Sequence, residues 1–372
     1  MKPSQGDRQM LGEILNQPNA WAETIGLVEG RADRLRELAE GIDEVIFTGC
    51  GSGLNAAVAI APTFQRFTGI RAKAVPAAEI VFFPETVFVP SGRPLVVPIS
   101  RSGATTETVM ARDAAKDRGM PTLAITCSPK SPLARQSTES LVLEPANEAS
   151  VTTTQSLTSM VLTGQLFSGI VSRNAGYLGQ LSQLPRLGRI IVDRSHELGR
   201  AIGENGAIAR FAFVGSGSLI GLARESQLKI KEMVLLPSDS YPLLDYRHGP
   251  KSNVDESMLV TVLTTDRTRS VEGEFISEMK GLKGRLLVIC EKSGTDITAG
   301  ADHVAELDSG LPDFARDILY MPPIHFLAYY ASLARGQSPA SPKNLTYWVE
   351  TQSLPLTGGA SGESTTGRPA RG

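Results

Sequence analysis

The chain has 372 residues, of which 41% are hydrophobic and 20% charged, and its formal net charge is −2. This length suffices for two domains with hydrophobic cores, and the near-zero charge gives no electrostatic basis for binding nucleic acid or an anionic membrane. No apolar stretch reaches transmembrane length, and the polar N-terminal residues lack the apolar core of a signal peptide. The three cysteines lie in or beside apolar runs without CxxC spacing, which predicts free thiols and a cytoplasmic location.

The predicted elements alternate between strands and helices after a helical start. Residues 9–40 show helical apolar spacing, and Asn16-Gln17-Pro18-Asn19 is predicted to break the first helix. The predicted elements that follow are strands at 44–48, 72–75, 95–99, 122–127 and 141–143, and helices at 55–67, 109–118 and 151–169. This α/β alternation predicts parallel sheets whose ligands bind beyond the carboxyl ends of the strands.

The second half of the chain repeats the first. The matching segments, at nearly constant spacing, are 47–52 with 213–218, 96–100 with 260–264, and 123–127 with 286–290. This self-similarity predicts a tandem duplication. The predicted parts are a helical segment at 1–40, a first domain at 41–172, a linker and lead-in helix at 173–198, a second domain at 199–340, a C-terminal segment that closes the site at 341–357, and a disordered tail at 358–372.

A hydroxyl-rich turn follows the most apolar predicted strand of the first half. Its sequence is Ser100-Arg101-Ser102-Gly103-Ala104-Thr105, and a predicted helix comes next. A strand, a turn of this kind and a helix N-terminus form an anion cradle, because backbone N–H groups and hydroxyls converge there. The alternative is an ordinary loop with a serine N-cap. No Walker lysine follows, and the Gly49-Cys50-Gly51-Ser52-Gly53 turn lacks the last glycine of a dinucleotide fingerprint, so no nucleotide cofactor is predicted.

Two further stretches carry groups suited to proton transfer. Glu225, Lys229 and Glu232 share one face of a predicted helix that begins after the Gly215-Ser216-Gly217 turn, although such a face can also be merely solvated. His248 lies in a polar loop, Asp245-Tyr246-Arg247-His248-Gly249-Pro250-Lys251, where a histidine suits proton shuttling. The other three histidines lack such a setting and are predicted to be structural.

Three motifs occurring together resemble those of the tandem sugar-isomerase (SIS) domain family. They are Ser-Arg-Ser-Gly at 100–103, Glu225-x3-Lys229-x2-Glu232, and Arg247-His248-Gly249-Pro250, and the resemblance runs from Glu13 to about Glu350. It implies two tandem domains, each a doubly wound, flavodoxin-like parallel sheet flanked by helices. The chain is similar both to the isomerase half of glucosamine-6-phosphate synthase and to the amino-sugar-phosphate isomerase/deaminases, including those of tagatose-6-phosphate ketose/aldose isomerase type; its Arg247–Ser252 stretch is more like the second group.

The resemblance also implies roles for the matching residues. Those implied to bind the substrate or its phosphate are Ser52, Ser100, Arg101, Ser102, Thr105, Val151 and Thr153. Glu232 would be the base that moves a proton between C1 and C2, and Lys229 and Glu225 would orient or polarise hydroxyls. His248 would help open the sugar ring, and in this family the histidine often comes from the neighbouring subunit of a homodimer.

Two departures from the synthase pattern bear on the reaction. Lys2 stands where a glutaminase has its nucleophilic cysteine, so glutaminase activity is not expected. Tyr347 stands where the synthase has its imine-forming lysine, and Lys343 reaches inward only if the tail folds differently. An amino sugar brings its own nitrogen and needs no enzyme imine, so these departures favour a deaminase or an isomerase.

The resulting prediction is a deaminase/aldose–ketose isomerase for glucosamine-6-phosphate or galactosamine-6-phosphate. The alternatives are isomerisation without loss of ammonia, deglycation of a phosphorylated sugar–amino-acid adduct, and a non-catalytic sugar-phosphate-binding regulator. Glu232 and His248 speak against the regulator, since a sensor needs neither. No cofactor, metal, nucleic acid or membrane partner is expected; the expected partners are the phosphorylated sugar and a second copy of the chain.

Overall fold

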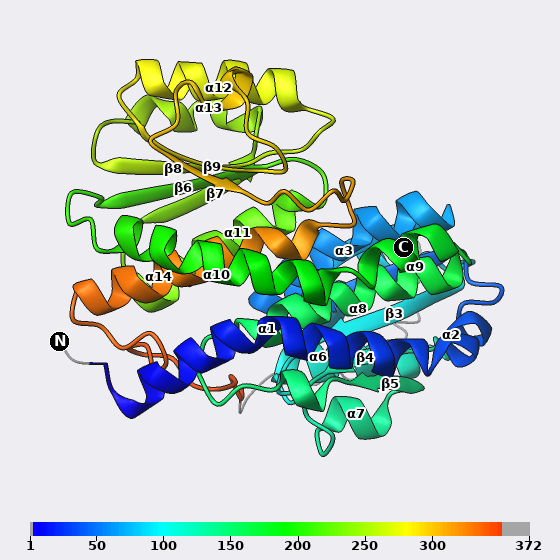
Figure 1. Ribbon diagram of the computed structural model, residues 1–372. Helices are drawn as coiled ribbons and strands as arrows, with labels where there is room; N and C mark the ends of the chain where they lie inside the picture. Colours follow the sequence, from blue (N-terminus) through cyan, green and yellow to red (C-terminus); the bar gives the residue numbers. More distant parts are fainter. Residues whose placement is uncertain (1–2, 352–372) are drawn as a thin grey trace, which may run out of the picture.

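The computed structural model describes residues 3–351, which form two α/β domains with a layer of helices between their sheets (Figure 1). Two helices, α1 (Gln5–Glu29) and α2 (Ala32–Leu38), lead into the first domain. Among the described residues no helix is both long and apolar enough to span a bilayer.

The first sheet is five-stranded, parallel, and ordered β2-β1-β3-β4-β5. Its strands are β1 (Glu44–Gly49), β2 (Arg71–Pro76), β3 (Pro94–Ile99), β4 (Leu123–Thr126) and β5 (Glu139–Val142). Its helices are α3 (Ser52–Thr68), α4 (Ala77–Phe82), α5 (Pro84–Val87), α6 (Thr106–Lys116), α7 (Pro132–Gln136) and α8 (Gln155–Val171). The chain reverses direction across the sheet at β1 and β3, which makes their carboxyl ends the expected ligand position.

The second sheet has the same order, with β7 and β10 at its edges: β10-β9-β8-β6-β7. Helices α9 (Ala175–Leu181) and α10 (Leu184–Gly203) lead into it. Its strands are β6 (Arg210–Gly215), β7 (Ser238–Pro242), β8 (Met258–Leu263), β9 (Arg285–Cys290) and β10 (His303–Glu306). Its helices are α11 (Leu219–Lys229), the π-helical turn η2 (Ile230–Val234), the 3₁₀ turns η3 (Asp245–Arg247), η4 (Pro250–Asn253) and η5 (Asp317–Tyr320), α12 (Arg269–Gly281), α13 (Thr295–Thr298) and α14 (Met321–Ala334). The shared strand order agrees with the predicted duplication.

One apolar core joins the two domains. Phe47 of β1 and Phe213 of β6 belong to the same buried cluster, which continues through α3, α8, α11 and α14. Residues that alternate with them along the strands, such as Ile46 and Val214, face separate clusters on the outer faces of the two sheets. The helices in the middle of Figure 1 therefore serve both sheets, and residues from both domains meet between them.

The contact between α3 and α11 brings the predicted site residues together. A Cβ atom on Gly221 of α11 would lie 2.4 Å from the backbone nitrogen of Ala59 in α3, so only glycine permits this approach. One helical turn further along α11, Glu225 faces the first turn of α3. The close packing of the two domains thus sets the distance between the glycine-rich turn before α3 and helix α11.

Several predictions about the helices are wrong. The helices predicted from residues 55 and 109 each begin three residues earlier, at Ser52 and Thr106. Helix α1 runs uninterrupted through Pro18. Proline has no N–H to donate to the Ile14 carbonyl four residues earlier, and the side-chain amide of Gln17 donates a 2.9 Å hydrogen bond to that carbonyl instead. The helix predicted from residue 151 begins at Gln155, and residues 151–154 form a loop. That loop carries two of the predicted substrate-binding residues.

Candidate active site

The hydroxyl-rich turn lies at the carboxyl end of β3 and leads into α6. The Ser100 hydroxyl lies 3.2 Å from that of Thr105 and 3.4 Å from that of Ser102, and it accepts a hydrogen bond from the Gly103 amide. The backbone N–H groups of Arg101, Ser102 and Thr105 have no acceptor within residues 3–351. Free amides, clustered hydroxyls and a helix N-terminus together form a site for an anion such as phosphate.

The Arg101 side chain is buried and turned toward the loops around the cradle. Its guanidinium donates to the carbonyls of Ser150 (2.7 Å), Val151 (2.8 Å) and Tyr347 (3.2 Å), and it stacks 3.9 Å from the centre of the Tyr347 ring. The Tyr347 hydroxyl in turn donates to the Glu148 carbonyl at 2.8 Å. Arg101 therefore ties the cradle to the 148–154 loop and to the C-terminal segment.

An ion cluster in which Glu225 and Lys229 are fully buried lies beside the cradle. The Lys229 ammonium is 3.1 Å from Glu225 Oε1 and 2.7 Å from Glu232 Oε2. Burial alone would lower the pKa of Lys229, but the Coulombic attraction and hydrogen bonding of these two carboxylates outweigh burial and raise it. The lysine is thus held cationic between them, and a charge buried in this way is stable only while its partners are in place.

Both domains supply the partners of Glu225. Ser52 Oγ and Asn55 Nδ2, in the first turn of α3, each donate to Glu225 at 2.9 Å. Thr153 Oγ1 donates to Ser52 Oγ at 3.0 Å and accepts from Lys229 at 3.3 Å. Glu225 and Lys229 are therefore not on a solvated helix face; they connect the glycine-rich turn, the 148–154 loop and Glu232.

Glu232 is the member of the cluster that reaches open space. It lies in η2, its side chain is 20% exposed, and its Oε1 makes no hydrogen bond or ion pair with any residue of the described range. Since Lys229 holds the other oxygen, Glu232 presents one carboxylate oxygen in a fixed direction. A carboxylate held like this is equipped to accept a proton.

A cavity of about 210 Å³ unites these parts. The predicted site residues that line it are Ser52, Ser100, Arg101, Ser102, Thr105, Val151, Thr153 and Glu232. The C-terminal segment contributes one wall through residues 345–349, including Tyr347, whereas Lys343 is exposed and does not line the cavity. Residues 352–357 of the predicted closing segment, and the predicted tail 358–372, lie outside the described residues.

His248 lies away from this cavity. It follows η3, its side chain is exposed, and it is not among the cavity-lining residues of its own chain. Arg247 (2.7 Å) and Lys251 (2.5 Å) on either side of it both pair with Glu278 of α12, which fixes the loop. His248 is the one predicted catalytic residue that the single chain does not bring to the others.

Two buried glutamates that the sequence did not single out shape the 148–154 loop. Glu148 accepts hydrogen bonds from the backbone N–H groups of residues 154–156 at the start of α8, and from the hydroxyls of Thr154 and Ser156. Glu13 of α1 accepts from the Ala149 amide at 2.8 Å. Glu148 lies seven residues before the first residue of α8, outside the N-cap and first-turn positions where a local pattern would show it, so the sequence carried no signal for this role.

Comparison with known proteins gives the same family. The SIS domain model matches two segments, residues 41–168 and 208–328. A Streptomyces coelicolor protein named "Putative D-galactosamine-6-phosphate deaminase AgaS" is 31% identical over 357 residues, covering 89% of this chain and 90% of the relative. The Arabidopsis thaliana "Glutamine--fructose-6-phosphate aminotransferase [isomerizing] 1" is 25% identical over 357 residues; the match spans 92% of this chain but only 51% of that relative.

Solved structures share the fold over nearly the whole chain. The Escherichia coli tagatose-6-phosphate ketose/aldose isomerase has a TM-score of 0.82 at 23% identity, covering 92% of this chain and 98% of that one. The Thermotoga maritima glucosamine-6-phosphate deaminase has a TM-score of 0.70 at 29% identity, covering 88% and 99%. The chain belongs to the SIS domain family, and the three of these proteins that it matches along nearly their whole length are named as phosphosugar isomerases or deaminases.

Proposed function

We propose that the chain is a hexosamine-6-phosphate deaminase/isomerase, acting on glucosamine-6-phosphate or galactosamine-6-phosphate. The observation that carries the proposal is that one cavity holds both an anion cradle and, at its side, the fixed carboxylate of Glu232. A phosphate in the cradle would direct the other end of the sugar into the remaining space. There the carboxylate can move a proton between neighbouring carbons.

The proposed reaction begins with the open-chain amino aldose. Glu232 takes the proton from C2, the electron pair forms a C1–C2 double bond, and O1 becomes an enol oxygen. Return of the proton to C1 leaves an imine at C2. Water adds to this imine and ammonia leaves, so amino aldose phosphate and water give ketose phosphate and ammonia.

Tyr347 supports a substrate that carries its own nitrogen. Its hydroxyl is engaged with the Glu148 carbonyl and with Asn147 (2.9 Å), and burial raises its pKa, an effect that Arg101 partly offsets. A phenol cannot form an imine with a ketose. The relatives named as galactosamine-6-phosphate and glucosamine-6-phosphate deaminases support the same substrate class.

We further propose that the active enzyme is a homodimer in which His248 serves the cavity of the partner subunit. The loop that carries His248 is fixed by Glu278, although the histidine itself is exposed and does not line the cavity of its own chain. Exposed Leu235 and Leu244 lie on either side of the edge strand β7, where a second copy could cover them. In this arrangement His248 would assist ring opening, as the family resemblance implies.

The proposal is tested by incubating purified protein separately with glucosamine-6-phosphate, galactosamine-6-phosphate and fructose-6-phosphate while ammonia and ketose are measured. Ammonia from one amino sugar, with matching ketose, is the expected result. Ketose–aldose interconversion without ammonia would instead establish a plain isomerase. Turnover of none of them, with binding retained, would favour a deglycase or a regulator.

The matched variants are Glu232→Gln and Glu204→Gln. The first should abolish turnover and still bind the phosphosugar, because the amide cannot accept the C2 proton. The second changes an exposed glutamate at the C-cap of α10 and should leave turnover unchanged. Full activity in Glu232→Gln would refute its assignment as the base.

A further inference from the structure

The second domain has a cavity of about 170 Å³ at the position equivalent to the phosphate cradle of the first. The two glycine-rich turns match: Gly51 and Gly217 both have left-handed backbones, with φ of 52° and 60°, and each precedes a serine. The strand ends also match, since the amides of Ser100 and Thr264 both donate to the neighbouring strand at 3.0 Å. The duplication has therefore kept a crevice at the second switch point of the fold.

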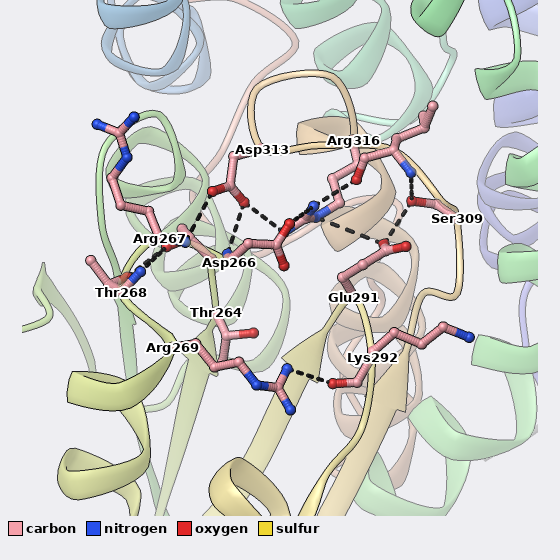
Figure 2. Close-up of polar contacts among 12 residues, drawn as sticks. Thr264, Asp266, Arg267, Thr268, Arg269, Glu291, Lys292, Ser309, Asp313 and Arg316 are labelled. Carbon is pink, nitrogen blue, oxygen red and sulfur yellow. Dashed lines mark hydrogen bonds and ion pairs between the residues drawn. The ribbon is translucent and has the colours of Figure 1, made fainter.

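This second crevice cannot hold a phosphate as the first one can. The amides of Asp266 (3.0 Å) and Arg267 (3.3 Å) already donate to the Asp313 carboxylate, and the Thr265 amide donates to Glu272 (3.0 Å). Figure 2 shows Asp313 above the 264–268 turn, between its amides and Arg316. Two carboxylates of the protein thus take the backbone donors that an anionic ligand would need.

The remaining groups around the cavity suit a ligand that offers hydroxyls. Asp317 lies in its wall, only 2% exposed, and its Oδ2 has no hydrogen-bond partner within residues 3–351. Arg267 also lines the cavity and makes no side-chain hydrogen bond or ion pair with another described residue; Figure 2 shows its guanidinium directed away from Asp313. A hydroxyl group can donate to the carboxyl oxygen and accept from the guanidinium.

An aromatic ring completes the wall. Phe314 adopts a left-handed backbone with φ of 70°, which is costly for a bulky residue, and Gln165 (2.6 Å) and Tyr177 (2.9 Å) hold its carbonyl in place. Its ring lines the cavity close to Gly217. A flat apolar surface beside polar groups suits a sugar ring, which has both kinds of face.

We propose that the second-domain cavity, lined by Ser216, Ser218, Arg267, Phe314 and Asp317, binds an unphosphorylated sugar of hexose size. Asp317 would accept a hydrogen bond from one hydroxyl, or from an amino group, and Arg267 would donate to another. The volume is close to that of the first cavity, but the phosphate position is filled by Asp313. This site is independent of the reaction proposed for the first cavity.

Hydrogen exchange of the full chain with glucose, glucosamine or inorganic phosphate tests the proposal. Either sugar should protect residues 264–268 and 313–320, whereas inorganic phosphate should protect residues 100–108 only. Ser216→Leu, which fills the cavity, should abolish the second-domain protection. Asp317→Asn, which keeps the shape and removes the charge, should weaken sugar binding by about tenfold in calorimetry. Ser102→Ala, in the first cavity, is the matched control and should leave this protection intact.

The proposal is overturned if neither sugar protects the second domain. It is also overturned if the protection persists in a folded Ser216→Leu protein, or if phosphate protects residues 264–268 as strongly as sugar does. Should Ser216→Leu fail to fold, an unchanged affinity in Asp317→Asn would be the contrary result. Since these are binding measurements without turnover, failure of the proposed deaminase reaction would not affect them.

Discussion

Ser102 has a hydroxyl on the cradle surface and is only half-buried, so it can donate to a bound phosphate directly. We predict that Ser102→Ala raises KM about tenfold to a hundredfold, the loss of one hydrogen bond to a charged group, and leaves kcat nearly unchanged. Steady-state kinetics on the phosphosugar that proves active measures both constants. Ser182→Ala, on an exposed turn, is the control, and an unchanged KM in Ser102→Ala would exclude its phosphate role.

Glu272 is a buried residue of α12 whose charge state controls stability rather than catalysis. Burial raises its pKa to about 7, against the opposing effect of hydrogen bonds from Thr268 and Thr265. In the unfolded chain its pKa is near 4.5, so between these two values the unfolded state loses a proton that the folded state keeps. This group therefore makes the folded state less stable as pH rises through that window.

Accordingly, Glu272→Gln should stabilise the protein relative to wild type as pH increases, by a few degrees in Tm between about pH 5 and about pH 8. Thermal unfolding across that range measures the difference. Glu278→Gln on the same helix is the control: Lys251 lowers the pKa of Glu278, so its difference from wild type should stay flat there. A flat difference for Glu272→Gln as well would show that its pKa is not raised.

At the scale of elements, the start of α8 determines the shape of the 148–154 loop. Glu148 satisfies three backbone amides that would otherwise be unpaired at this buried helix end, and the same loop presents Val151 and Thr153 to the cavity. Glu148→Gln puts an amide group, which is itself a donor, among these donors. We predict a loss of about 1–3 kcal/mol in unfolding free energy and a higher KM.

Denaturant unfolding and steady-state kinetics on the same Glu148→Gln protein check this prediction. Glu144→Gln, in the short 3₁₀ turn η1 (Glu144–Ala146) just before Glu148, is the matched control and should change neither quantity. If KM stays at the wild-type value while stability falls, then Glu148 stabilises α8 without positioning the loop.

The sequence predicted those elements whose pattern is local. Five of the strands and the repeat were predicted from apolar runs and turn residues. A strand buried in a parallel sheet has a continuous run of apolar residues whatever it packs against. The prediction that the first helix breaks at Pro18 failed because the hydrogen bond from the Gln17 side chain to the Ile14 carbonyl depends on a rotamer, which residue spacing does not reveal. The start of α8 was misplaced because Thr and Val, the residue types at 151–154, are compatible with either a helix or a loop.

The motifs predicted which residues would line the site, but not how their side chains are arranged. The cradle hydroxyls and Glu232 line one cavity, as the motifs indicate. The sequence could not show that Arg101 points toward carbonyls of two distant loops, or that Lys229 is buried between two carboxylates. The first depends on where the 148–154 loop and the C-terminal segment lie. The second depends on the packing of α11 against α3, which brings together residues about 170 positions apart.

At the scale of the whole molecule, both domains contribute residues to the cavity of the proposed active site. The first domain supplies the cradle, the second supplies Glu232 through α11 and η2, and residues 345–349 form one wall of the cavity. Of the residues proposed for catalysis, His248 alone does not meet the others; it is exposed, on a loop held by the ion pairs of Arg247 and Lys251 with Glu278. A site that is complete except for one exposed group is what a dimer with shared active sites would show in a single chain.

This arrangement makes a specific prediction for mixed dimers. Glu232→Gln lacks the base and His248→Ala lacks the ring-opening group, so each variant alone should be nearly inactive. If His248 acts in the partner's cavity, a mixed dimer contains one cavity with both defects and one with neither. After unfolding and refolding together, about half of the dimers are mixed, so about a quarter of wild-type activity should return. If His248 acts in its own chain, every cavity of a mixed dimer has one defect and no activity returns; sedimentation must show a dimer in both cases.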